Sequence, residues 1–90
     1  MAFRKTKKRE LTDEDLKTLR EFYGFDVQNM NAGKYQYVRI RLPKKSSYQF
    51  FDWYWTTGSI TCTEIAGGYT SKVGKSKDAE DVALLINEHV

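Results

Sequence analysis

The 90-residue chain contains one cysteine, one histidine and one proline, and each scarcity excludes a class of structure. A single cysteine excludes an internal disulfide and a multi-cysteine zinc site. Cys62 stands inside a predicted strand, where we expect a small buried residue in a reducing compartment. His89 lies near the C-terminus, so the sequence suggests neither a serine–histidine nor a cysteine–histidine pair. We therefore predict that the protein is not an enzyme.

Long apolar runs are also missing. No stretch reaches the length needed to span a bilayer, and no apolar segment follows the basic N-terminus as it would in a signal peptide. The sequence therefore predicts an intracellular protein, cytoplasmic or, in a eukaryote, nuclear, without a membrane partner. Ninety residues make one modest core, and nothing in the sequence indicates a cofactor.

What the chain does have is an uneven distribution of charge. The net charge is +3, but residues 1–10 hold five basic residues against one acid, whereas the remaining eighty hold ten basic and eleven acidic residues. We interpret residues 1–10 as a disordered basic arm and residues 11–90 as a single α+β domain. The arm is either a solubilising terminus or a segment that binds phosphate.

Aromatic and β-branched residues are concentrated in residues 48–66, where they form a hairpin pattern around a polar loop at residues 56–59. A four-residue loop would place Trp55 opposite Ile60 and Trp53 opposite Cys62. This even spacing sorts the side chains into two faces. The predicted core face is Phe51, Trp53, Trp55, Ile60 and Cys62.

Residues 35–42 form the clearest strand before this hairpin, and Pro43 ends it because proline cannot donate to the ladder. Its even positions belong with the tryptophan face, and they are Gln36, Val38, Ile40 and Leu42. Its odd positions carry tyrosines and arginines on the opposite face. A further short strand at residues 25–28 stays an open alternative, because turn-forming residues follow it.

Two amphipathic helices flank the strands. Thr12 is a predicted N-cap before three acids, and Gly24 is predicted to end the first helix. The second helix is expected from Ser76 or Asp78 onward, after a glycine-containing loop at residues 67–75. The predicted fold is an α+β two-layer sandwich, a three-stranded antiparallel meander with two helices on one face, in the order α-β-β-β-α.

The sheet face away from the helices would stay open to water, as antiparallel sheets allow. Its expected members are Tyr35, Tyr37, Arg39, Arg41, Tyr48, Phe50, Tyr54, Thr61 and Thr63. Aromatic residues interleaved with arginines on a sheet can stack bases and neutralise phosphates. The same aromatic residues also suit cross-strand packing or contact with a second protein chain.

Charge placement favours a polyanion on the strand-and-loop side. Most basic residues of the domain lie in residues 34–45 and 72–77, and most of its acids lie in the predicted helices. The candidate nucleic-acid-binding residues are Lys7, Lys8, Arg9, Tyr37, Arg39, Arg41, Lys44, Lys45, Tyr54, Lys72, Lys75 and Lys77.

A glycine, a lysine and a serine at residues 74–76 come before the last helix, as at the end of a phosphate-binding P-loop, but the glycine spacing does not match. Backbone amides at this helix start, beside Lys75 and Lys77, could still hold one phosphate.

The same segment resembles the double-stranded RNA-binding domain. That family has the order α-β-β-β-α and a Ser-Lys-Lys cluster at the start of its second helix, where this chain has Ser76 and Lys77. Asp78 and Glu80 stand where the family has lysines, and the Gly-Pro-x-His loop is missing. The resemblance implies two helices on one sheet face.

Two functional hypotheses follow. The first is a small non-enzymatic nucleic-acid-binding module, for RNA or DNA, that uses the basic arm and a basic, aromatic sheet-and-loop surface. The second is a regulatory or inhibitory protein that binds a protein partner, or a second copy of itself, through the open sheet face and the hairpin.

Overall fold

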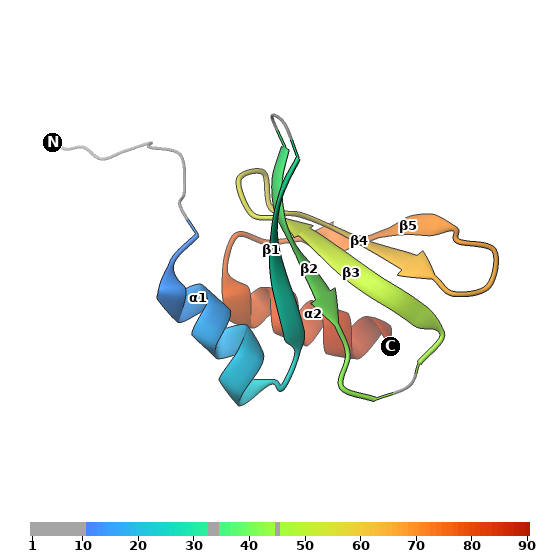
Figure 1. The fold of residues 1–90 in the computed structure, drawn as a ribbon, viewed down its shortest axis with the longest axis horizontal. Helices are drawn as coiled ribbons and strands as arrows, with labels where there is room; N and C mark the ends of the chain where they lie inside the picture. Colours follow the sequence, from blue (N-terminus) through green and yellow to red (C-terminus); the bar gives the residue numbers. More distant parts are fainter. Residues whose placement is uncertain (1–10, 33–34, 45) are drawn as a thin grey trace, which may run out of the picture.

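The computed structural model describes residues 11–32, 35–44 and 46–90, so the predicted basic arm lies outside the described residues. The described chain forms a sheet with helices packed on one side of it (Figure 1). In chain order the elements are α1 (Asp13–Lys17), the π-helical turn η1 (Thr18–Phe22), β1 (Asp26–Ala32), β2 (Tyr35–Arg41), β3 (Tyr48–Tyr54), β4 (Ser59–Glu64), β5 (Thr70–Lys75) and α2 (Ala79–His89).

The sheet is antiparallel throughout, and its strand order β1-β2-β3-β4-β5 follows the sequence. It has five strands within the described ranges, so the predicted three-stranded meander is wrong. The predicted order α-β-β-β-α lacks one strand at each end of the sheet. The α+β class itself is compatible with the structure.

The strands that the prediction missed are the two edges of the sheet. β1 extends the segment at residues 25–28 that the sequence left open, and β5 occupies most of the predicted loop at residues 67–75. An edge strand pairs on one side only and contributes few side chains to the core. β1 buries Val27 and β5 partly buries Val73, so neither sequence shows a sustained alternation of apolar and polar residues.

The β3–β4 hairpin pairs Trp53 with Ile60, so its loop comprises residues 55–58. The predicted register, with a loop at residues 56–59, is therefore wrong by two residues. Because side chains alternate with a period of two, an even shift by itself moves no side chain to the other face. Gly58 lies in this turn with a φ of +90°, a value that glycine adopts without strain.

The core lies between the sheet and the helices, and it contains the predicted inward side of the hairpin. Its residues with no exposed surface are Leu19, Val38, Ile40, Phe51, Trp53, Ile60, Cys62, Val82, Ala83 and Ile86. Trp55 departs from the prediction because it is only partly buried, at the start of the loop. The indole Nε1–H of Trp53 donates to the carbonyl oxygen of Ser76 at 2.9 Å, which ties the sheet to the segment before α2.

Local signals set the first helix as predicted. Thr12 and Asp15 form a capping box, in which each side chain accepts from the backbone N–H of the other at 3.1 Å. The helix widens into the turn η1 and ends at Gly24, whose φ is +71°. Arg20 of η1 donates from Nη2 to the carbonyl oxygen of Val27 at 2.7 Å, so η1 is fastened to β1.

Candidate nucleic-acid interface

A row of cross-strand partners crosses the sheet face that lies opposite the helices. The register pairs Gln28 with Arg39, Arg39 with Asp52, Asp52 with Thr61, and Thr61 with Lys72. Directly paired residues of an antiparallel sheet share a face, so one row joins β1 to β5. In the part of the chain that the structure describes, the helices pack on the other face (Figure 1).

We call this surface the open face. Its members in and beside the central row are Gln28, Tyr37, Arg39, Arg41, Phe50, Asp52, Tyr54, Ser59, Thr61, Thr63, Thr70, Lys72 and Lys75. The predicted sorting of the β2 and β3 side chains is confirmed at its centre, because Val38, Ile40, Phe51 and Trp53 are fully buried on the helix side.

Arg39 and Asp52 form a bidentate ion pair at the centre of the open face. Arg39 Nε and Nη2 donate to Asp52 Oδ1 and Oδ2 at 3.0 and 3.2 Å. The two side chains are only 23% and 10% exposed, respectively, so water screens the pair little. The hydrogen bond from Arg39 to Asp52 raises the pKa of Arg39 above its ordinary value, against the opposing effect of burial.

Aromatic rings surround this ion pair. The guanidinium carbon of Arg39 lies 3.7 Å from the centre of the Phe50 ring and 5.8 Å from that of Tyr37. The Tyr37 and Tyr54 rings meet across β2 and β3, with centroids 4.8 Å apart. The centre of the open face is therefore a continuous set of flat groups.

Cations lie toward both ends of the row. Arg41 donates from Nη1 to Gln28 Oε1 at 3.1 Å, and its guanidinium carbon is 5.9 Å from the Phe50 ring centre. Lys72 is exposed on β5, beyond the hydroxyl groups of β4. Arg41 and Lys72 are thus placed to meet an anion that approaches the open face.

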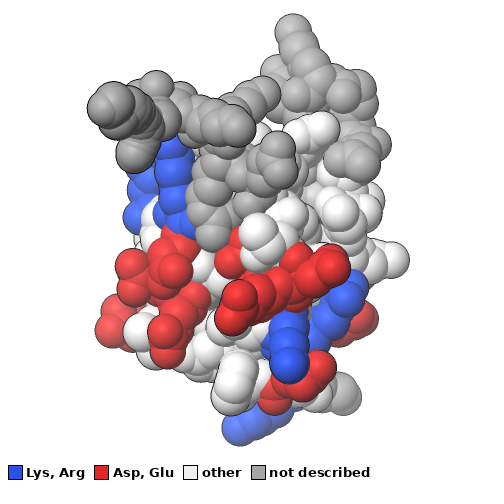
Figure 2. Space-filling view, turned by 90° about the vertical axis from the view of Figure 1, so that its left-hand side faces the viewer, with Lys and Arg blue, Asp and Glu red and all other residues white. Residues whose placement is uncertain are grey.

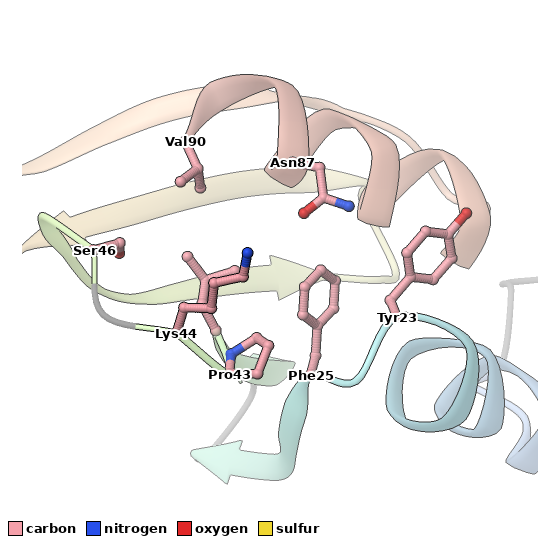
Figure 3. A pocket seen from close by; sticks show the side chains of 8 residues that line it. Tyr23, Phe25, Pro43, Lys44, Ser46, Asn87 and Val90 are labelled. Atoms are coloured by element: carbon pink, nitrogen blue, oxygen red, sulfur yellow. The ribbon is translucent and has the colours of Figure 1, made fainter.

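Other predicted site residues lie away from the centre of the open face. Lys44 lines a pocket of about 250 Å³ between the β2–β3 connection and the end of α2, where Phe25 and Asn87 face the same space (Figure 3). Lys75 pairs with Ser59, which pairs with Tyr54, so the register places Lys75 on the open face at its β5 edge, and the residue also borders a hollow against α2. Lys77 lies beside the β3–β4 turn. The structure therefore places Lys44 and Lys77 away from the centre of the open face, and Lys75 at its β5 edge beyond Tyr54 and Ser59.

Several candidates are not described. Lys7, Lys8, Arg9 and Lys45 lie outside the described residues, as does the side chain of Tyr35.

Tyr48 was expected on the open face, and this expectation is wrong. Its ring lies 5.4 Å from that of Phe51 and 5.3 Å from that of His89, on the helix side. The cause is a β-bulge between Tyr48 and Phe50, which places Gln49 as an extra residue and reverses the alternation. No feature of the sequence marked this bulge.

Asp52 and Gln28 are site residues that the sequence reasoning did not select. Asp52 stands between Phe51 and Trp53, both on the predicted core face, so alternation puts it on the face of Arg39, and this is a signal for an ion pair in the sequence. Gln28 was missed because β1 was not among the predicted strands.

Acidic side chains gather on the side of the molecule that carries α1 and the start of α2 (Figure 2). The exposed acids of these first turns are Asp13, Glu14, Glu80 and Asp81. The acidic helical side predicted from the sequence is therefore confirmed. It lies away from the row of Arg39 and Lys72, so the two surfaces present different charges.

The structure also brings together a cysteine and a histidine that the sequence did not pair. Cys62 Sγ lies 3.6 Å from His89 Nε2 and 3.4 Å from Ser71 Oγ. Cys62 is fully buried, as expected of a small core residue. Within the described ranges, no group of three or more histidine, cysteine, aspartate or glutamate side chains is arranged to hold a metal ion.

None of the helices in the described part of the chain has the length and apolar character needed to cross a bilayer. No protein-family model, curated protein or solved structure matches this chain.

Proposed function

We propose that the protein is a non-enzymatic module that binds nucleic acid through the open face. The observation that supports this most directly is the set of aromatic rings at its centre, with Tyr37 and Tyr54 4.8 Å apart and Phe50 beneath Arg39. Rings on a sheet surface accept bases by stacking, while nearby cations neutralise phosphates.

The distribution of charge supports the same proposal. The acids of α1 and α2 would repel a polyanion from the helical side, and Arg41 and Lys72 would attract it to the open face. Residues 1–10 add five cations that can contact phosphates outside the sheet.

Phosphate contacts are assigned to Arg41 and Lys72 and not to Arg39, because Asp52 already neutralises Arg39. Each cation that contacts a phosphate of a single strand releases condensed counterions and contributes about 0.7 to the slope of log affinity against log salt. We therefore expect Lys72→Ala to weaken binding severalfold at low salt and to reduce that slope by roughly 0.7.

Fluorescence anisotropy with labelled RNA and DNA at several salt concentrations measures both quantities. Lys17→Ala is the control, since Lys17 is also an exposed lysine but lies on α1. The slope of log affinity against log salt for Lys17→Ala should equal that of the unmodified chain. Equal effects of the two substitutions, or no binding to any nucleic acid at low salt, would contradict the proposal. A stable dimer without nucleic-acid binding would instead favour the open face as a protein-binding surface.

A further inference from the structure

Arg39 is the cation at the centre of the open face, but Asp52 already neutralises its charge. Both oxygens of Asp52 accept from it, and that carboxylate is 10% exposed. A phosphate that took Arg39 for itself would leave Asp52 buried without its partner, which is costly. The centre of the open face is therefore close to electrically neutral and poorly suited to a phosphate.

The flat surface of the Arg39 guanidinium is still available for stacking. The guanidinium lies over Phe50 at 3.7 Å, and 23% of the side chain faces solvent. Asp52 holds the group in place through its Nε and Nη2 atoms, so little conformational freedom is lost when another flat group stacks on it. Tyr37 extends the same surface toward Tyr54.

We infer that the centre of the open face is a platform for unpaired bases, in which Arg39 is a stacking plane held by Asp52 and is not a phosphate ligand. This inference rests on the proposed function and narrows it to single strands, because the bases of a duplex are stacked on one another and do not offer their faces. Arg41 and Lys72, toward the two ends of the row, contact the backbone of the strand.

A comparison of three oligonucleotides tests the platform in the full chain. They are a single strand, a strand of equal length in which most bases are replaced by abasic sites, and a blunt duplex. Stacking of one base is worth enough to change affinity by about tenfold or more. We expect the ordinary single strand to bind at least tenfold more tightly than the abasic strand, which has the same phosphates, and more tightly than the duplex.

Two substitutions separate stacking from charge. Arg39→Lys keeps the positive charge beside Asp52 but removes the plane, so it should weaken single-strand binding by about tenfold with an unchanged salt slope. Lys72→Gln should reduce the slope by roughly 0.7 and leave the preference for the ordinary strand over the abasic strand intact. Phe50→Leu serves as a second test of the plane if Arg39→Lys impairs folding, which circular dichroism detects.

The outcomes distinguish this inference from the proposed function. Equal affinity for the ordinary and abasic strands would overturn the platform while leaving nucleic-acid binding in place. An Arg39→Lys variant whose salt dependence of binding falls as much as that of Lys72→Gln would do the same. Absence of binding to all three oligonucleotides at low salt would overturn both.

Discussion

Trp53 and Trp55 stand two residues apart on the same predicted face, yet their surroundings differ. Trp53 is fully buried and bonded to Ser76, whereas Trp55 is partly buried and its Nε1 has no hydrogen-bond partner among the described residues. Trp53→Ala should lower the free energy of unfolding by about 3–5 kcal/mol, because it creates a core cavity. Trp55→Ala should cost less, about 1–2 kcal/mol. Urea unfolding measures both, and equal losses would contradict the difference in burial.

At the scale of the residue, the sequence predicted which side chains of β2 and β3 face the core and which face outward. The alternation of apolar and polar positions in residues 35–42 and 48–55 placed Val38 and Trp53 inside and Arg39 outside, and the structure agrees. It could not predict where alternation is interrupted. The bulge before Phe50 brings Tyr48 against His89, a residue distant in sequence, so local sequence does not show this contact.

At the scale of the elements, glycines in two turns test how closely the β3–β4 turn packs against the segment before α2. Gly58 and Gly68 both have positive φ values, of +90° and +66°. An added Cβ at Gly58 would lie 3.2 Å from the carbonyl oxygen of Ser76, but at Gly68 it would meet open space. Gly68→Ala should therefore cost roughly 1–2 kcal/mol from backbone strain alone.

Gly58→Ala should cost more than Gly68→Ala, since its methyl group also presses on the segment before α2. Thermal unfolding followed by circular dichroism compares the two variants. An equal loss of stability would show that the turn and Ser76 can separate without penalty.

Elements with a strong pattern were predicted, and those with a weak pattern were not. β3 and β4 are rich in aromatic and β-branched residues and are paired on both sides, so their composition identifies them. β1 and β5 are edges whose sequences are mostly polar, and β5 is also irregular where Val73 stands as an extra residue against β4. Their strand character comes from pairing with β2 and β4, which local sequence does not show.

On the scale of the whole molecule, the basic arm and the open face are expected to contribute differently to binding. Replacing Lys7, Lys8 and Arg9 together with glutamine should reduce the salt slope by as much as about 2, at about 0.7 for each lost phosphate contact. The preference for an ordinary single strand over an abasic one should not change, because it originates at the centre of the sheet. Loss of that preference in the arm variant would show that the arm, and not the sheet, reads the bases.

The sequence predicted the overall separation of charge because acids fill the first turns of both helices, where they suit the helix dipole. It did not predict that a carboxylate would neutralise the central arginine. That property depends on the register of β2 against β3, and register is a feature of the assembled sheet.

The bond from the indole of Trp53 to Ser76 has a practical consequence. It joins a fully buried fluorophore in the sheet to the peptide segment that leads into α2. In a Trp55→Phe background, the emission of the remaining indole would report when the last helix lifts from the sheet. The fluorescence of Trp53 would therefore measure the packing of α2 against the sheet.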